Sequence, residues 1–173
     1  MKIRSSTLGF TLTELILVIV LLSILSLFAA SRFIGKSSFS AFALQEQVIS
    51  VIRQVQVNRM QSNIDGTDDN FRLQVSSSCI GSLRACDLQL KCEIDKNETA
   101  CNLLAARSDF VADDSAQFSI KGDVERPIDF NLLGNPLNSA SRGASILIKS
   151  TNGGSRCEVD INSQGYVSKG SCS

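Results

Sequence analysis

The sequence contains no histidine, and this absence removes most of the familiar catalytic machinery. Ser-His-Asp triads and Cys-His nucleophile pairs both need an imidazole as general base, so only rarer chemistries remain. No other arrangement of nucleophile and base is visible along the chain. We therefore predict that the protein is not an enzyme, and we expect neither a cofactor nor a small-molecule substrate.

Proline is also scarce, with two residues in 173, and long glycine-rich, serine-rich or repetitive tracts are absent. These absences argue against a flexible linker or a repeat array. An excess of positive charge is missing too, because 17 basic residues balance 17 acidic ones. The composition therefore provides no broad electrostatic attraction to nucleic acid.

The sequence does contain a long apolar run, residues 15–30, and a carboxylate, Glu14, immediately before it. A charge at the mouth of a membrane-length helix is costly unless it is paired. The 21 residues from Phe10 to Ala30 would cover ~31 Å as a helix, which is close to the hydrocarbon thickness of a bilayer.

Two ordinary interpretations compete for this segment. A secretory signal peptide would use Lys2 and Arg4 as its basic region and residues 29–31 as its cleavage site. A plain single-span anchor would use the apolar run alone. Neither interpretation explains why an acid, Glu14, stands at the start of the run.

The series Gly9-Phe10-Thr11-Leu12-Thr13-Glu14 resembles the N-terminus of the type IV pilin and pseudopilin superfamily. In that family a prepilin peptidase cuts after the glycine and methylates the new N-terminal residue. The resemblance implies a leader of residues 1–9, a cut between Gly9 and Phe10, and methylation of Phe10. Glu14 would then pair with the ammonium of its own Phe10 or of a neighbouring subunit, which would fix one axial register of assembly.

The chain departs from the family pattern at three positions. Family members usually carry an aliphatic residue where this chain has Thr13, and many carry a glycine in place of Ser23 and a proline in place of Ser31. Serine neither lacks an N–H nor clashes with the preceding turn. We therefore expect a straighter and more continuous helix than the family average.

Lys2 and Arg4 favour a cytoplasmic leader, although Arg32 weakens the asymmetry. Residues 10–33 would form a transmembrane helix that later joins a filament core, and residues 34–173 a periplasmic or extracellular head. Removal of the leader reduces the 17 basic residues to 15 against 17 acids, so the mature chain has a net charge near minus two.

All six cysteines fall in this expected head, on the exported side where disulfides form and persist. Several pairings are conceivable, and the short spacings favour Cys79 with Cys86, Cys92 with Cys101, and Cys157 with Cys172. Zinc is the alternative. However, the first four cysteines are separated by six, five and eight residues, which are not the short knuckles of zinc sites, and no histidine is available. We expect disulfides and no metal.

An apolar stripe recurs at intervals of three and four residues after the apolar run and consists of Ala41, Leu44, Val48, Val51 and Val55. It predicts that the helix continues, bent near Gly35, and packs this face on a sheet. Its solvent side is marked by polar residues, Arg53, Asn58, Arg59 and Gln61. Residues 63–70, with Gly66, are expected to end the helix.

Seven runs indicate strands, at residues 71–75, 87–94, 118–120, 128–132, 145–149, 157–161 and 166–168. Residues 152–154, Asn-Gly-Gly, indicate a tight hairpin, and residues 162–165 another turn. The segment 96–115 is compatible with a short helix or a loop. The expected fold class is α+β, a pilin-like fold in which one long helix, transmembrane in its first half, packs on an antiparallel sheet.

The tail, through residues 130–136, 146–148, 158–161 and 165–167, resembles the C-terminal strands of the GspH/FimT group of minor pilins and pseudopilins. With residues 39–60 and the cysteine layout, it is most similar to minor pilins of mannose-sensitive haemagglutinin (MSHA) pili. Some FimT-like pilins bind DNA through a basic motif after the glycine that precedes the last strand. Here Gly165 is followed by Tyr166, Val167, Ser168 and Lys169, so the arginines are absent and we expect no nucleic-acid partner.

An acidic loop, Asp65, Asp68 and Asp69 with Asn70, offers the oxygen ligands that calcium takes. The spacing matches no EF-hand loop, and a solvated turn after the helix explains the same residues. The sequence leaves open whether this loop binds calcium.

The resemblance implies a minor type IV pilin of the MSHA type, which joins or primes a filament and supports pilus biogenesis and surface adhesion. Its partners would be other pilin subunits, the prepilin peptidase and, before assembly, the inner membrane, which it would cross once. After assembly it would belong to an extracellular filament. A type II secretion pseudopilin of the GspH type is the alternative within the superfamily. A DNA-binding or adhesin pilin at the fibre tip is the alternative of another class.

Overall fold

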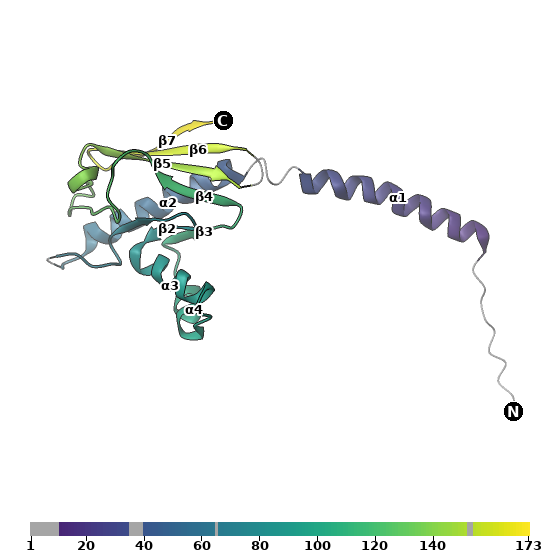
Figure 1. The fold of residues 1–173 in the computed structure, drawn as a ribbon, viewed down its shortest axis with the longest axis horizontal. Helices are drawn as coiled ribbons and strands as arrows, with labels where there is room; N and C mark the ends of the chain where they lie inside the picture. The colour runs from purple at the N-terminus through teal and green to yellow at the C-terminus, as the bar shows by residue number, and fades with distance from the viewer. Residues whose placement is uncertain (1–10, 35–39, 65, 152–153) are drawn as a thin grey trace, which may run out of the picture. The chain divides into compact units, whose positions relative to one another are not determined.

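The computed structural model describes residues 11–34, 40–64, 66–151 and 154–173, without the side chains of residues 27–34 and Ser40. The chain divides into two compact units, Met1–Lys36 and Ser37–Ser173 (Figure 1). The predicted bend near Gly35 and the residues of the predicted cleavage site, Gly9 and Phe10, lie outside the described residues.

The first unit contains the helix α1, Leu12–Ile34, which is apolar along most of its length. Its large apolar side chains from Leu12 to Leu25 are all between 45% and 76% exposed, on every side of the helix. A soluble surface helix would instead show one apolar stripe and one polar face. The apolar surface of α1 is therefore not explained by packing within the first unit.

The helix α1 runs through Ser23 and Ser31 without interruption, as the lack of glycine and proline at these positions predicted. Ser23 Oγ donates to the carbonyl oxygens of Ile19 and Val20, at 2.9 and 2.8 Å, so its hydroxyl is satisfied inside the helix. Within the described residues, no helix is both long and apolar enough to count as a membrane-crossing segment. The predicted span of residues 10–33 begins outside the described residues and stays a prediction.

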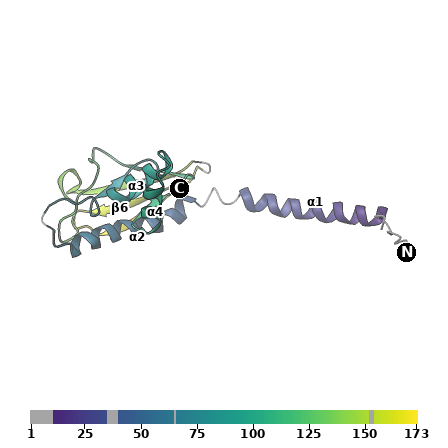
Figure 2. The ribbon, with the colours of Figure 1, turned by 90° about the horizontal axis from the view of Figure 1, so that it is seen from below.

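The second unit begins with α2, Ser40–Gln61, and has the expected α+β class, but it contains two antiparallel sheets and not the single predicted sheet. The smaller sheet has the order β1-β2-β3 and consists of β1, Leu73–Val75, β2, Cys79–Ser82, and β3, Phe110–Ala112. The larger sheet follows chain order and consists of β4, Ala116–Ile120, β5, Gly143–Ser150, β6, Arg156–Asn162, and β7, Val167–Cys172. Figure 2 shows α2 running along the length of this unit.

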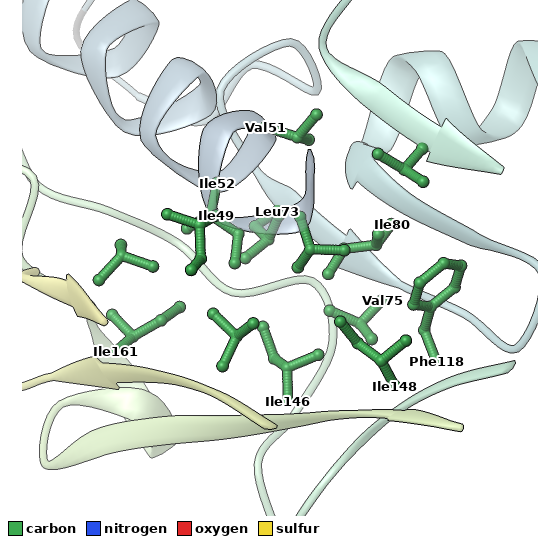
Figure 3. Close-up of a cluster of buried hydrophobic side chains, with 14 of the residues drawn as sticks. Ile49, Val51, Ile52, Leu73, Val75, Ile80, Phe118, Ile146, Ile148 and Ile161 are labelled. Carbon is green, nitrogen blue, oxygen red and sulfur yellow. The ribbon is translucent and has the colours of Figure 1, made fainter. Parts of the chain in front are cut away.

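The apolar face of α2 is buried against both sheets, and the five stripe residues predicted from the sequence, Ala41, Leu44, Val48, Val51 and Val55, all lie in this core. Figure 3 shows Ile49 and Ile52 of α2 facing Ile146 and Ile161 of the larger sheet. The strands β5 and β6 alternate buried and outward residues, so the larger sheet keeps one face toward α2 and one face open.

The opposite side of α2 is only partly solvated, which corrects the sequence interpretation. Arg53 and Gln61 are exposed, whereas Asn58 and Arg59 are half-buried. Arg59 Nε donates to the carbonyl oxygen of Phe130 at 3.1 Å, and Arg53 Nη2 donates to that of Val167 at 2.8 Å. These two guanidinium groups donate to backbone oxygens. Arg59 thereby connects α2 to the loop before β5, and Arg53 connects α2 to β7.

The six cysteines, which all lie in the described part of the chain, form the three disulfides that the short spacings favoured. Cys79 with Cys86 ties β2 to the helix α3, Leu83–Glu93, and Cys92 with Cys101 ties α3 to α4, Glu98–Ala105. Cys157 with Cys172 joins β6 to β7. Figure 1 shows α3 and α4 next to each other, on the side of the smaller sheet that is opposite to the strands β5 to β7.

The predicted strand at residues 87–94 is wrong, because residues 87–93 belong to α3 and Ile94 is its C-cap. Its buried residues, Ala85, Cys86, Leu88 and Gln89, follow a helical spacing, and Ser82 caps the helix by accepting the N–H of Ala85. The apparent two-residue alternation of Leu88 and Leu90 does not mark a strand face, since Leu90 is half exposed. The undecided segment 96–115 contains both α4 and β3.

The predicted strand at residues 128–132 is also wrong, since Ile128 and Phe130 make only isolated bridges. Asn131 Oδ1 accepts the N–H groups of Leu133 and Asn135, both at 2.9 Å, and so folds the backbone into a turn. The strands β2 and β3 were not predicted. The turn at 162–165 is confirmed, with Gly165 at a φ of +78° and its N–H bonded to Asn162. Residues 152–153 of the predicted hairpin lie outside the described residues.

Candidate functional site

The start of α1 places Thr11 and Glu14 in a reciprocal pair of hydrogen bonds. The N–H of Glu14 donates to Thr11 Oγ1 at 3.3 Å, and Glu14 Oε2 accepts the N–H of Thr11 at 3.3 Å and its hydroxyl at 3.2 Å. This arrangement is a capping box, in which each side chain satisfies a backbone donor that the first helical turn leaves unpaired. The sequence therefore positions the Glu14 carboxylate by local chemistry alone.

The Glu14 carboxylate keeps the capacity for a further partner. Only Oε2 is used by Thr11, and within the described residues Oε1 accepts no hydrogen bond. The carboxylate is exposed and lies in the first turn of α1, where the helix dipole favours a negative charge. A cation that approached the start of α1 would therefore find one carboxylate oxygen held in place and one free.

Thr11 is a functional candidate that the sequence interpretation missed. The signal was present, because a threonine followed three residues later by a glutamate, just before an apolar run, is the sequence signature of a capping box. The structure brings Thr11 and Glu14 together but does not describe Gly9 or Phe10. Cleavage after Gly9, methylation of Phe10 and pairing of Glu14 with an ammonium stay predictions.

In the second unit, Asp109 is buried, with 5% of its surface exposed. Burial raises the pKa of its carboxyl, but hydrogen bonds from Arg107 and Ser82 and the charge of Arg107 outweigh this effect, so the pKa lies below its ordinary value. Arg107 contacts both carboxylate oxygens, at 2.9 and 2.6 Å, and also Asn70 Oδ1 at 3.1 Å. This cluster joins the chain before β3 to the loop after α2, and we assign it a structural role.

The acidic loop after α2 is occupied by internal contacts. Asp68 Oδ1 accepts both the backbone N–H and the side-chain amide of Asn70 at 2.8 Å, and Asp69 lies 3.8 Å from Arg72. Asp65 lies outside the described residues. Over the part of the chain that the structure describes, no group of three or more potential metal ligands is gathered.

The residues after Gly165 are split between the two faces of the larger sheet. Tyr166 is 64% exposed and Val167 is buried in the core. Lys169, the one cation among the four residues after Gly165, is ion-paired with Glu46 of α2. The absence of a nucleic-acid partner stays a prediction.

Comparison of this chain with family models, curated proteins and solved structures gave no match. Function must therefore be inferred from the residues and geometry of the chain itself.

Proposed function

We propose that the protein is a minor subunit of a type IV pilus, of the MSHA type, that enters or primes the filament through its N-terminal helix. In this proposal prepilin peptidase removes residues 1–9 and methylates Phe10. The subunit waits in the inner membrane with its head in the periplasm and then moves into the extracellular filament. There it supports pilus biogenesis and surface adhesion.

The exposed apolar surface of α1 is the observation that carries the proposal. Eleven large apolar side chains between Leu12 and Leu25 are at least 45% exposed, although burying one such side chain contributes about 1.5–3 kcal/mol. A helix that is apolar all round belongs in a membrane or in the core of a large assembly. A filament subunit uses both environments in turn, and a plain anchor uses only the first.

The geometry at Glu14 supports the filament over the anchor. The carboxylate is held by Thr11 through Oε2, and within the described residues Oε1 accepts no hydrogen bond. After cleavage, the ammonium of Phe10 would stand one residue before Thr11, in the same subunit or in the next. Since neither charge tolerates isolation in low dielectric, their pairing would select one axial register.

The head supports an exported location. Three disulfides join its elements, and disulfides persist on the oxidising side of the membrane. The hydrophobic core consists of residues from Ala41 onward, so the head is organised around its own interior.

The proposal is tested in cells that express the chain together with a complete pilus system. We expect the protein in the sheared filament fraction and in the membrane, and only in the membrane of cells that lack the prepilin peptidase. Equal recovery in the sheared fraction with and without the peptidase would contradict the proposal. The major pilin serves as the control for shearing.

A further inference from the structure

The open face of the larger sheet contains a hollow of about 480 Å³ at the end where β6 turns into β7. Its lining includes the small residues Gly143, Ser145 and Ser168 and the longer side chains of Lys121, Arg142 and Tyr166. Its volume falls within the range of ligand sites. The hollow uses no residue of α1, so a ligand could occupy it whether or not the chain assembles into a filament.

A row of polar groups crosses the floor of this hollow. Ser145 lies opposite Asp160 in the register of β5 and β6, and Asp160 lies opposite Ser168 in that of β6 and β7. Lys121 adjoins Ser145, since its N–H donates to the Ser145 carbonyl oxygen at 2.8 Å. Adjacent strands are about 4.8 Å apart, so the row offers hydroxyl and carboxylate oxygens at regular steps. Ser145 Oγ donates to Asp160 Oδ1 at 2.5 Å, which fixes the centre of the row.

Tyr166 is presented at the edge of the hollow by a rigid turn. Asn162 Oδ1 accepts the N–H of Tyr166 at 2.9 Å, and the N–H of Asn162 donates to the Tyr166 carbonyl oxygen at 3.0 Å. Gly165, just before it, has a φ of +78°, and an added Cβ would lie 2.2 Å from the carbonyl oxygen of Gly134. The exposed ring of Tyr166 is therefore attached to a backbone with little conformational freedom. Binding sites that use tyrosine as a flat contact surface share this property.

The charges around the hollow select the kind of ligand. Lys121 is ion-paired with Glu158, and Asp160 adds a second acid. Arg142 is exposed and has no hydrogen-bond or ion-pair partner among the described residues. Two cations against two acids leave no broad basic surface for a long polyanion such as a nucleic acid. The free guanidinium can instead bind a single carboxylate with two parallel hydrogen bonds.

We propose that this hollow binds an acidic saccharide, a sugar that carries a carboxylate, such as a uronic acid. The sugar ring stacks its C–H face on Tyr166, its hydroxyls exchange hydrogen bonds with Asp160 and Ser168, and its carboxylate binds Arg142. The hollow lacks the excess of positive charge that binding of a nucleic acid would need. A neutral sugar would leave the guanidinium of Arg142 without a partner.

The test uses the full chain in detergent, with tri-galacturonic acid as the acidic probe, galactotriose as the neutral probe and a short oligo-thymidylate as the nucleic acid. The chain has one tyrosine and no tryptophan, so tyrosine fluorescence reports on Tyr166 alone. We expect a saturable fluorescence change with tri-galacturonic acid, and at least tenfold weaker binding of galactotriose. Calorimetry measures the same affinities in variants that lack the tyrosine.

Four variants separate the roles. Arg142→Gln should weaken binding of tri-galacturonic acid about tenfold or more, because it removes a charged hydrogen-bonding partner. Arg156→Gln is the matched control, since Arg156 is an exposed arginine of the same sheet outside the hollow, and it should leave the affinity unchanged. By calorimetry, Tyr166→Phe should retain binding and Tyr166→Ala should lose it.

Three results would overturn the proposal. The first is the absence of a saturable signal with tri-galacturonic acid. The second is equal binding of galactotriose, or tighter binding of oligo-thymidylate. The third is an equal loss of affinity in the variants Arg142→Gln and Arg156→Gln.

Discussion

Replacing Glu14 by glutamine separates the two tasks that the structure gives to this side chain. Its Oε2 completes a capping box with Thr11, and its charge is available to an ammonium. Glutamine serves in a capping box as glutamate does, so Glu14→Gln keeps the cap and removes only the charge. Thr11→Ala does the reverse, since it removes the capping hydroxyl and leaves the carboxylate.

The two losses differ in size and in what they affect. Loss of an N-cap hydroxyl costs about 0.5–2 kcal/mol of helix stability. Loss of a charged hydrogen bond in a desolvated contact costs about 1.5–3 kcal/mol, which is roughly ten- to hundredfold in the affinity of each subunit contact. We therefore expect Glu14→Gln to insert and to be cut normally but to reach the filament poorly, and Thr11→Ala to assemble at a level between Glu14→Gln and the unmodified chain.

The assay compares three fractions for each variant: uncut chain, cut chain in the membrane, and chain sheared from the cell surface. Glu14→Ala, which loses both cap and charge, should behave at least as poorly in assembly as Glu14→Gln. If Glu14→Gln enters filaments as well as the unmodified chain while Thr11→Ala does not, the carboxylate acts only as a cap. The charge-pairing account would then be refuted.

Further outcomes are expected elsewhere in the chain. Gly9→Ala should slow or block processing and leave an uncut band on a gel, because the peptidase reads the small residue before the cut. Non-reducing mass spectrometry should find three disulfides, Cys79 with Cys86, Cys92 with Cys101 and Cys157 with Cys172, and a free thiol or another pairing would contradict the fold. Asp109→Asn should destabilise the head by about 1–3 kcal/mol at neutral pH, measured by denaturant unfolding, whereas Asp95→Asn, at an exposed position, should be neutral. The pKa of the Asp109 carboxyl is lowered in the folded state. The ionised carboxylate therefore stabilises the fold above the ordinary aspartate pKa of ~4, and this stabilisation is lost as the pH falls through the pKa of the folded state. Asp109→Asn should remove this part of the acid sensitivity of folding.

The parts of the fold that could be predicted are those in which local pattern and burial agree. The apolar stripe of α2 is regular over four turns, and every member of it is buried. The turn at 162–165 needs a residue with positive φ, and Gly165 provides it. The three disulfides close short segments, so chain proximity already favoured them.

The wrong or missed predictions of secondary structure lie where contacts between distant parts of the chain determine the conformation. The segment 87–94 alternates leucines as a strand would, but the disulfide from Cys86 and the cap at Ser82 favour a helix. β2 is buried at all four positions and shows no alternation, and β3 has only three residues, so neither has a local signature. At the candidate site, Glu14 was visible as a misplaced charge, whereas Thr11 becomes visible only when the residues are read as a capping pair.

The central claim is that proteolysis creates an amine beside an acid that is already held in place. N-terminal sequencing, with mass spectrometry, of the protein isolated from cells tests this claim most directly. The account predicts a chain that begins at N-methylated Phe10. A chain that begins at Met1, or at Arg32 after signal-peptide removal, would contradict it.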